Sequence, residues 1–445
     1  MTTLKAIKPR HPEALSEAEP RRTHNSLQFS GGFEKVMQPM ETATPPMTTE
    51  VIVVGGGPTG LLAGVALASG GVRTALVAAR EPYGDNRTTA LLAGSLNALR
   101  ALDVWPRCEA QASPISTIRI IDDRSGLLKA PEVAFEAAEI GLPAFGHNIE
   151  NSVLMTALET RAAALENLER IDAAAAEIAA DDDRIIVRTT DGRVIAGRLV
   201  VGADGRNSLC RRSADIGIQS HAYDQIAVTL TFRHARPHRG ISTEFHTDSG
   251  PFTMVPLPGD RSSLVWVIGA SEAERIAALD GHELNAELER RSHSILGKID
   301  ADPRRSAFPL TLQTASTLAV NRIALIGEAA HVLPPIGAQG LNLGFRDAAA
   351  IADCVIDALA RGEDPGGDRT LAEYDRTRQF DVRSRSVAVD LLNRSLLTDF
   401  IPVQGARGLG LYMSAKFGPL RRALMREGVA PRGREPRLMR GDMAS

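Results

Sequence analysis

Several features that define other classes of protein are scarce or absent in this chain. Its 445 residues include only three cysteines, Cys108, Cys210 and Cys354, which lie far apart and lack metal-ligand spacing. This argues against a disulfide framework and indicates a reducing compartment, with Cys210 as a buried spectator thiol. A net charge of −3 gives no basic surplus for a nucleic-acid partner. No internal repeat is found.

The chain also lacks an uninterrupted apolar run that could cross a membrane. Residues 51–72 carry no charge, but seven of them are glycine and one is proline, so a lipid-facing helix is not expected. The segment 1–47 mixes Pro, Glu, Arg, Ser and Thr with little periodicity and has no apolar core of a secretory signal. We therefore expect a soluble protein whose residues 1–47 are a disordered extension or a wrongly included part of the reading frame.

Glycine, by contrast, is concentrated in motifs. In the first, the β-branched run 50–54 precedes Gly55, Gly57 and Gly60, and an apolar helix follows over 61–69. Strand, glycine-rich turn and helix in this order form a dinucleotide-binding fingerprint. Gly55 allows the tight turn, Gly57 lets the backbone approach a pyrophosphate, and Gly60 allows helix and strand to pack closely. The fingerprint alone does not distinguish FAD from NAD.

A second motif lies far downstream. Residues 199–211, LVVGADGRNSLCR, begin as a buried type of strand that ends in Asp204 and Gly205. An ordinary turn is the alternative interpretation, because Asp-Gly is a common turn pair.

The third motif is the most informative. Residues 327–347, GEAAHVLPPIGAQGLNLGFRD, indicate a loop that leads into a helix beginning near Gly340 or Leu341. Backbone amides at the start of a helix stabilise negative charge, such as that on the N1–C2=O edge of a reduced flavin. The glycines and small residues let the backbone approach a flat ligand. This motif therefore predicts a flavin site.

Together the motifs make the chain resemble the class A flavoprotein aromatic hydroxylases, the group typified by para-hydroxybenzoate hydroxylase. They occur in the order and at the separations of that group, and the resemblance covers about residues 50–431. Within the group, NRTTAL at 86–91, GHNIEN at 146–151 and the wording GEAAHVLPPIGAQGLNL resemble the ubiquinone-biosynthesis hydroxylases. The implied α/β fold has a Rossmann-like FAD-binding domain of the glutathione-reductase type, an inserted, mostly antiparallel β-sheet substrate domain and C-terminal helices.

The resemblance also implies the reactants and the catalytic residues. FAD would be bound, NAD(P)H would be a transient co-substrate, and O2 would supply the oxygen atom. Backbone amides of Gly340, Leu341 and Asn342 would contact the pyrimidine edge of the flavin. Pro335 and Gly337 would line the face where oxygen reacts, so that Pro335, Gly337 and Gly340 form the expected catalytic set. The cofactor carries the difficult chemistry, and the protein orients the ring and excludes water.

Further cofactor-binding residues are carried over by motif. Arg87, Asp204 and Gly205 would lie near the FAD phosphates and the approach of the nicotinamide, and Leu154 would lie on the adenine side. An ordinary surface cation is the alternative for Arg87.

Two positions depart from the family pattern. Ala78 stands where an acidic residue is expected to bind the adenosine ribose, so Glu81 or backbone and water are left to hold it. Glu328 stands where most relatives have an aspartate that binds the ribityl chain. We expect Glu328 to keep this role, and a purely structural role is the alternative.

The patterning also predicts the domain organisation. A helix is expected over 151–164, and strands over 184–189 and 193–201 are expected to join the sheet of the FAD-binding domain. The predicted parts are an FAD-binding domain from 48–221 and 314–369, a substrate-binding β-sheet domain at 222–313, C-terminal helices over 370–430 and a flexible tail at 431–445.

The histidines and the candidate pocket residues each have a functional and a structural interpretation. His234 and His238 have helical ligand spacing but lie among arginines, so no metal site is expected. For His331 we expect local hydrogen bonding. His246 is either a base for the substrate phenol or, as we favour, a solvated histidine on a strand face. Candidate pocket walls, each with sheet core as the favoured alternative, are Phe252, Met254, Pro256 and Trp266.

These patterns lead to one functional prediction. The protein is expected to be an FAD-dependent monooxygenase that hydroxylates the ring of a polyprenylated phenol or quinol in ubiquinone biosynthesis, with other proteins of that pathway as candidate partners. The tail over 407–440 is cationic and amphipathic, which favours a cytoplasmic protein resting on the inner face of the membrane. A capping helix is the alternative. The other functions considered are hydroxylation of a small soluble aromatic compound and a non-catalytic flavin-binding subunit.

Overall fold

The computed structural model describes residues 46–80, 87–125, 130–397, 417–429 and 435–440. The expected disordered extension therefore lies outside the described residues, except at its end. Met47 is part of strand β1 (Met47–Thr48), which pairs with residues 195–196, so the folded chain begins earlier than expected.

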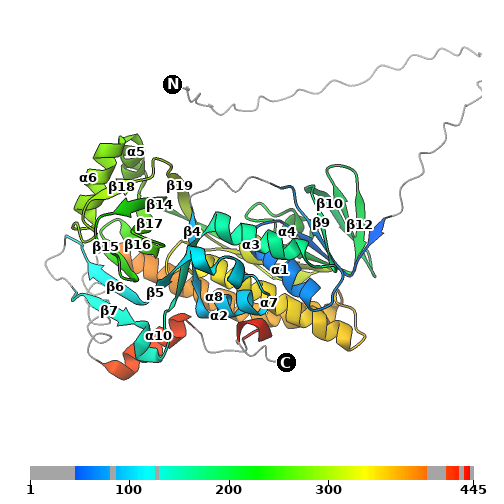
Figure 1. Ribbon diagram of the computed structural model, residues 1–445. Coiled ribbons are helices and arrows are strands. Elements are labelled where there is room, and N and C mark those ends of the chain that lie inside the picture. Colours follow the sequence, from blue (N-terminus) through cyan, green and yellow to red (C-terminus); the bar gives the residue numbers. More distant parts are fainter. Residues whose placement is uncertain (1–45, 81–86, 126–129, 398–416, 430–434, 441–445) are drawn as a thin grey trace, which may run out of the picture. The chain divides into compact units, whose positions relative to one another are not determined.

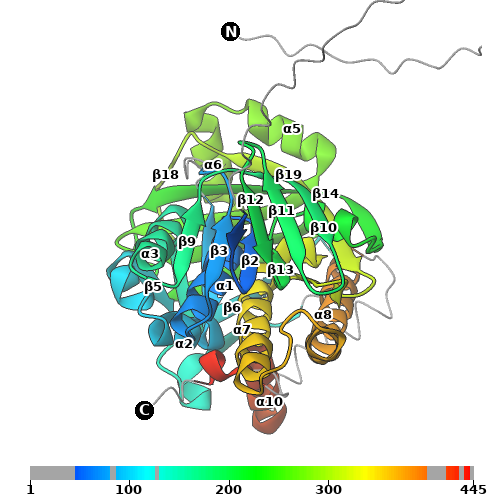
Figure 2. The same cartoon turned by 90° about the vertical axis from the view of Figure 1, so that its right-hand side faces the viewer.

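A six-stranded sheet forms the core of the expected FAD-binding domain (Figures 1 and 2). Its central strands are buried at every position, as expected of parallel strands covered on both faces. The edge strand β20 is antiparallel to its neighbour β21, which follows it directly in the chain. The strands, in spatial order, are β20 (Ala319–Val320), β21 (Ile323–Leu325), β13 (Leu199–Gly202), β2 (Val51–Val54), β3 (Thr74–Val77) and β9 (Leu168–Ile171).

The uncharged segment after β2 forms α1 (Pro58–Ser69), whose residues from Gly60 to Ala68 are all buried. The helix packs against the sheet, against α3 (Asn151–Ala163) and against α7 (Gln339–Ala360). Its lack of charge reflects burial inside the protein. Within the described part of the chain, no helix combines the length and apolarity needed to span a bilayer.

A four-stranded sheet lies in the order β1, β12 (Val194–Gly197), β11 (Ile185–Thr189) and β10 (Ala175–Ala180). The prediction that residues 184–189 and 193–201 both join the FAD-domain sheet was wrong for β11 and β12. Burial alternates along β11, so one face is exposed, whereas the following β13 is buried throughout and joins the parallel sheet.

The largest sheet has nine strands and contains the strands expected in the substrate domain. It also includes strands from outside 222–313: β6 and β7 lie earlier in the chain, and β22 belongs to the third glycine motif. The flavin motif is thus hydrogen-bonded directly into this sheet. The strands are β22 (His331–Val332), β19 (Ser306–Ala315), β14 (Ile218–His234), β17 (Arg261–Gly269), β16 (Gly250–Leu257), β15 (Ile241–Thr247), β6 (Thr117–Asp122) and β7 (Val133–Glu136), with β18 (Ile299–Ala301) paired to β14.

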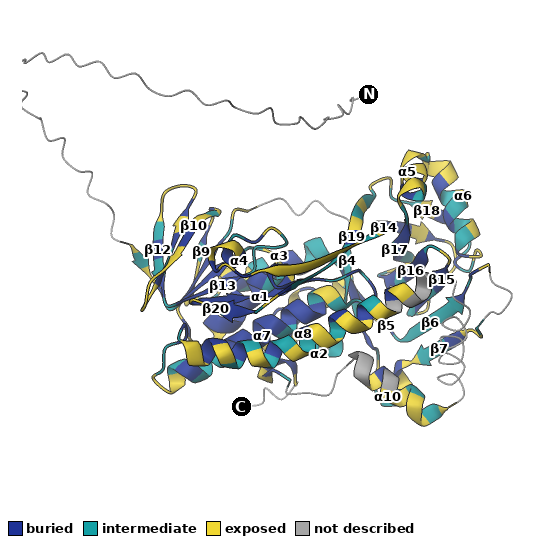
Figure 3. Ribbon diagram, turned by 180° about the vertical axis from the view of Figure 1, so that it is seen from behind, coloured by how far each residue is buried: buried dark blue, intermediate teal, exposed yellow. Residues whose placement is uncertain are grey.

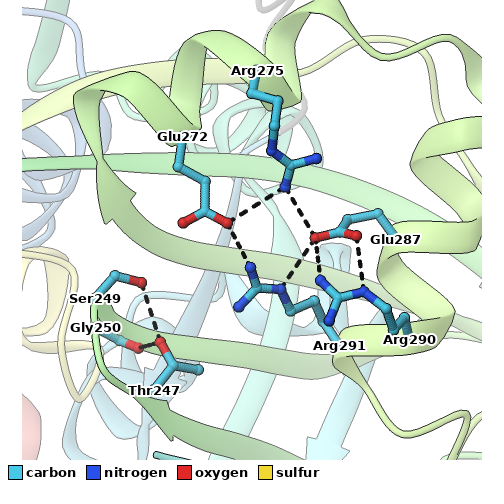
Figure 4. Close-up of polar contacts among 8 residues, drawn as sticks. All are labelled: Thr247, Ser249, Gly250, Glu272, Arg275, Glu287, Arg290 and Arg291. Atoms are coloured by element: carbon cyan, nitrogen blue, oxygen red, sulfur yellow. Dashed lines mark hydrogen bonds and ion pairs between the residues drawn. The ribbon is translucent and has the colours of Figure 1, made fainter. Parts of the chain in front are cut away.

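One face of this sheet is covered by α5 (Ala270–Ala278) and α6 (Gly281–Arg291). Phe252, Met254 and Trp266 point into the core beneath these helices, so the sheet-core interpretation of these candidate pocket walls is confirmed. Figure 4 shows the ion pairs that join the two helices, in which Arg291 contacts both Glu272 and Glu287. Strand residues of the other parity, such as Glu244 and Thr253, occupy the opposite face.

A three-stranded sheet connects the two larger ones, in the order β4 (Thr88–Leu92), β8 (Gly146–Glu150) and β5 (Ala112–Ile115). The Nδ2 of Asn148 donates to the Ser263 hydroxyl on β17 over 3.0 Å, and the Thr88 hydroxyl contacts the same oxygen over 2.8 Å. The remaining helices are α2 (Ala93–Ala101), η1 (Trp105–Arg107), η2 (Glu109–Gln111), η3 (Ala137–Ile140), α4 (Leu209–Ser213), η4 (Gly327–Ala329), α8 (Asp368–Leu397), α10 (Gly418–Val429) and η5 (Arg437–Met439).

The expected flexible tail contains a packed segment. Leu438 and Met439 of η5 are buried, and Arg437 pairs with Asp353 on α7 over 2.9 Å. The Nδ2 of Asn97 on α2 also donates to the Met439 carbonyl. Burial of two apolar side chains and these polar contacts hold residues 435–440 against α2 and α7.

Candidate active site

The three glycine motifs converge at one edge of the six-stranded sheet. β2, β13 and β21 are parallel neighbours, with Gly202 paired to both Val54 and Leu325. The carboxyl ends of these strands therefore meet, and each motif begins where its strand ends. Dinucleotides bind at this edge of open α/β sheets. The predicted convergence of the motifs is confirmed.

Close backbone contacts explain why glycine is needed at two positions. A Cβ added at Gly55, whose φ is +119°, would lie 2.2 Å from the carbonyl oxygen of Ala203. One added at Gly60 would lie 2.0 Å from the carbonyl oxygen of Gly55. A side chain at either position would push the strand, the turn and the start of α1 apart.

Other glycines of the motifs face open space. A Cβ added at Gly57, Gly205 or Gly340 would meet no protein atom within 4 Å. One of these glycines comes from each motif, so each motif contains backbone that the rest of the protein does not cover. This arrangement fits a dinucleotide whose pyrophosphate and flavin contact backbone amides.

The carboxylate of Asp204 has a structural role in this arrangement. Its Oδ1 accepts a hydrogen bond from the Ser208 hydroxyl over 2.6 Å, and its Oδ2 accepts one from the amide of Cys210 over 3.0 Å. These bonds hold the Asp-Gly turn and the start of α4. The turn interpretation is therefore confirmed, and a contact from Asp204 to the cofactor remains a prediction. Burial raises the pKa of the Cys210 thiol, which agrees with an unreactive spectator.

Glu328 lies in η4, which follows β21, and 54% of its side chain is exposed. Its Oε2 pairs with the guanidinium of Arg206, from the Asp-Gly motif, over 3.3 Å. The carboxylate is accessible to a ligand, and its contact with the ribityl chain remains a prediction.

The third motif positions the start of α7, which begins at Gln339, one residue before the earlier of the two expected positions. The first four amides of a helix have no acceptor within it, so those of Gly340 and Leu341 can bind an anionic edge, whereas the amide of Asn342 already has the Ala338 carbonyl four residues back as its helical acceptor. Just before the helix, Gly337 and Ala338 have φ angles of 65° and 54°. Such a conformation is costly for alanine and is kept only where the surroundings hold it.

The Asn342 side chain helps to hold this turn. Its Oδ1 accepts hydrogen bonds from the Leu92 amide and the Ser95 hydroxyl, and its Nδ2 donates to the carbonyls of Ala90 and Ala338. The side chain thus ties β4 and α2 to the start of α7. Pro335, half-buried, and Gly337, exposed, lie in the same loop.

The adenosine end of the site differs from the usual pattern. Glu81 lies outside the described residues, and Ala78 follows β3 with no carboxylate. Arg170, on the neighbouring strand β9, donates to the Ala78 carbonyl and would lie 3.3 Å from a Cβ at Gly56. The buried Nε of Arg170 has no acceptor among the described residues. Sequence reasoning missed this residue, because only the pairing of β3 with β9 brings it here.

Two further residues, Arg87 and Leu154, were predicted to contact FAD. Arg87 is exposed at the start of β4, and its carbonyl accepts the amide of Asn151 over 2.9 Å. The side chain of Leu154 on α3 is fully buried in the main core. Its visible role is packing, and contacts of Arg87 and Leu154 with FAD remain predictions.

His331 and Asp347, both buried, form an ion pair of 2.6 Å between Nε2 and Oδ2. The local hydrogen-bonding role expected for His331 is confirmed. Asp347 also accepts the amide of Gly327 and pairs with Arg378 on α8 over 2.8 Å. Burial acts to raise the pKa of Asp347, but the charges of His331 and Arg378 outweigh it and hold that pKa below its ordinary value.

The expectation that His246 is solvated was wrong. Its side chain is buried, and Nε2 lies 2.7 Å from Oε1 of the half-buried Glu244. His246 lies on the sheet face opposite the α5–α6 core, and the alternation alone did not reveal that this face is covered too. A ring nitrogen of His234 contacts the Arg236 carbonyl, and one of His238 contacts the Leu257 carbonyl. Within the described ranges, no three potential metal ligands cluster together.

Comparison with known proteins agrees with this geometry. Residues 48–385 match the model of a family described as FAD binding domain. The chain is 36% identical over 416 residues to ubiquinone hydroxylase UbiL of Rhodospirillum rubrum. This match covers 90% of this chain and 96% of that protein. It is 29% identical to 3-demethoxyubiquinol 3-hydroxylase of Escherichia coli, over 85% and 97% of the two chains. HpxO of Klebsiella pneumoniae, complexed with FAD, has a similar fold, with a TM-score of 0.70, 18% identity and coverage of 87% and 99%.

The open flank of Gly57 allows a test of the cofactor site. Because a Cβ there meets no protein atom, Gly57→Ala should change the unfolding free energy of the apoprotein by no more than about 1 kcal/mol. It should weaken FAD binding roughly tenfold or more, about 1.4 kcal/mol per factor of ten, by blocking the pyrophosphate. Flavin fluorescence titration and urea denaturation measure the two effects. Gly281→Ala, at another open glycine, is the control, and unchanged FAD affinity in Gly57→Ala would contradict the assignment.

A second prediction concerns pH. Burial opposes ionisation of Asp381 on α8, but Arg378, Arg346 and Arg385 hold its pKa at about 2, against an ordinary 3.8. A depressed pKa contributes stability above pH 4 that is lost as the pH falls towards 2, here about 2 kcal/mol at 1.4 kcal/mol per pH unit. Asp381→Asn should therefore be less stable than the wild type at pH 7, and the difference should narrow between pH 4 and 2 in urea denaturation. A difference that is constant over this range would refute the ion-pair origin.

Proposed function

The chain belongs to the FAD-binding domain family, within its group of ubiquinone-biosynthesis hydroxylases, and we propose that its substrate is an electron-rich ring that carries a polyprenyl tail. The protein is an FAD-dependent aromatic monooxygenase of ubiquinone biosynthesis. The observation that carries the proposal is the position of the third motif. Its strand β22 pairs with β19 of the nine-stranded sheet, and the next residues form the loop that leads to α7.

This connection gives the flavin loop and the substrate sheet one continuous backbone. Gln313 and Thr314 of β19 pair with Val332 and His331, immediately before the loop Leu333–Ala338. A ring held over the sheet would therefore lie beside the loop that is expected to face the flavin. Full-length similarity to UbiL and to 3-demethoxyubiquinol 3-hydroxylase supports a quinol-type ring as the acceptor.

The protein side chains and amides would then act by positioning. When bound, FAD takes a hydride from NAD(P)H and activates O2 for transfer of one oxygen atom to the ring. The backbones of Gly57 and Gly205 would hold the phosphates, and Glu328 would hold the ribityl hydroxyls. The amides of Gly340 and Leu341 would stabilise negative charge at the pyrimidine edge. Pro335 and Gly337 would shape the dry space between flavin and substrate.

Quinone profiling by mass spectrometry tests the substrate class. In a strain that lacks this protein, a polyprenylated intermediate one hydroxyl group short of the product should accumulate, and the mass of its ring would identify the missing step. An unchanged quinone profile would reject the proposal and favour hydroxylation of a small soluble aromatic compound. Purified protein should be yellow and should oxidise NAD(P)H with quinol-precursor analogues. FAD binding without any turnover would instead indicate a non-catalytic subunit.

We further propose that the polyprenyl substrate is received from an anionic membrane surface. Much of the tail predicted for this role, including Leu409, Leu411 and Lys416, lies outside the described residues. Within α10, Arg421 pairs with Glu139 over 2.6 Å and Met425 is buried, which agrees with a capping helix.

A more suitable surface runs along α8 (Figure 3). Phe380, Val387 and Leu391 are 78%, 57% and 62% exposed and follow one face of the helix. Arg376 and Arg383 are exposed on the same face, and the two carboxylates between residues 376 and 394, Asp381 and Asp390, are half-buried. Apolar side chains flanked by cations suit an anionic bilayer surface.

Vesicle sedimentation tests this surface. The wild type should bind vesicles that contain phosphatidylglycerol more tightly than vesicles of phosphatidylcholine alone. The triple change Phe380→Ser, Val387→Ser and Leu391→Ser should reduce binding roughly tenfold or more, since each buried CH₂ contributes about 0.8 kcal/mol. Ile218→Ser replaces an exposed apolar residue on β14 and should have no effect. Equal binding by the triple variant and the control would overturn the assignment.

A further inference from the structure

Both ends of the loop 333–338 are anchored to α8 by one chain of polar contacts, which is buried at the entry of the loop and partly exposed at its exit. His331, before the loop, pairs with Asp347, and Arg378 pairs with the other oxygen of that carboxylate over 2.8 Å. From Arg378, a guanidinium nitrogen reaches Asp381 over 2.7 Å. The chain thus passes from the entry of the loop onto α8.

The same chain returns to the exit of the loop. Arg385 pairs with Asp381 over 2.8 Å and also donates to the side-chain oxygen Oε1 of Gln339, the first residue of α7. The Nε2 of Gln339 in turn donates to the Gly337 carbonyl over 3.0 Å. The last link therefore ends on the backbone of the loop, at one of the residues with positive φ.

Burial makes this chain selective for one geometry. The side chains of Asp347 and Arg378 are 0% and 3% exposed, and those of Arg385 and Asp381 are 14% and 17% exposed. Removing one partner of a buried ion pair leaves the other uncompensated, which is strongly destabilising. Alternative positions of Gln339 would lose its contact with Arg385, and the turn at Gly337 and Ala338 needs such external support because its backbone is strained.

We propose that Arg385 and Gln339 are positioning residues for the oxygen reaction: through the Gly337 carbonyl they set the loop and the first amides of α7 against the flavin. Neither side chain is assigned a contact with FAD. Their effect is to fix where those amides lie, and a displacement of about 1 Å at a reacting centre costs up to roughly a hundredfold in rate. The inference rests on the proposed placement of the flavin edge at the start of α7.

The first test compares Arg385→Gln with Arg369→Gln. Both replace an arginine of α8, but Arg369 is exposed and pairs with Glu363 at the surface, away from the flavin loop. Arg385→Gln should still bind FAD. Its bound flavin should show a shifted visible spectrum and a lower reduction potential, because the stabilising amides are displaced. With a quinol analogue, the fraction of NAD(P)H that yields hydroxylated product should fall roughly tenfold, with hydrogen peroxide formed instead. Arg369→Gln should match the wild type in all four measurements.

Three further variants separate positioning from general stability. Gln339→Ala should reproduce the spectral and coupling changes, and the double variant with Arg385→Gln should add little, because both residues act through one contact. Arg385→Lys should restore little, since an ammonium cannot match the fork that reaches both Asp381 and Gln339. If Arg385→Gln lowers only the unfolding midpoint and leaves spectrum, potential and coupling unchanged, the residue is purely structural and the proposal fails.

A separate variant tests the flavin placement itself. Gly340→Val adds a side chain at the open flank of α7 and should alter the spectrum and affinity of FAD wherever the pyrimidine edge lies there. If Gly340→Val changes the flavin spectrum and affinity but Arg385→Gln changes neither spectrum, potential nor coupling, only the positioning role of Arg385 is rejected. No effect of Gly340→Val rejects the placement on which that role depends.

Discussion

The structure depends on the close approach of backbone to backbone where β2, β13 and α1 meet. Gly55 and Gly60 allow contacts that any Cβ would prevent, and the amide of Ala203 completes them by donating to the Val54 carbonyl over 2.7 Å. This approach brings the carboxyl ends of neighbouring strands into register. Each of the three motifs contributes a glycine that no other protein atom crowds, so a bound dinucleotide can contact backbone from remote parts of the chain.

A second constraint is the helix α8, which contacts both large sheets and α7. Near its middle, Arg378 and Asp381 form the ion pairs behind the flavin loop. Farther along, Asp390 accepts a hydrogen bond from the Tyr223 hydroxyl over 2.6 Å, and Asn393 donates to Gln225, both on β14. One rigid helix therefore connects the flavin loop to the substrate sheet. A small shift between these two parts would change the distance between flavin and ring, which makes a stiff connection valuable to the reaction.

Much of the flavin site could be predicted from local sequence because its requirements are local. Strand, turn and helix follow one another in the first motif, and the glycines there report the conformations and approaches that the fold needs. The start of α7 was predicted within one or two residues for the same reason. The side chains behind the site were not predicted. Arg170 reaches the adenosine end through strand pairing, and Arg385 reaches Gln339 from 46 residues away; neither lies in a recognisable motif.

The sequence by itself determined the dinucleotide fold, the three motif segments and the family, because glycine spacing and hydrophobic patterning act over a few residues. Tertiary structure decided which side chains face the site. Alternation along β15, β16 and β17 shows which residues share a face, but only the packing of α5 and α6 places Phe252 and Trp266 in the core and leaves His246 on the other side. The same holds for Asp347, Arg378 and Arg385, whose charges are stabilised by partners that only the folded chain brings within reach.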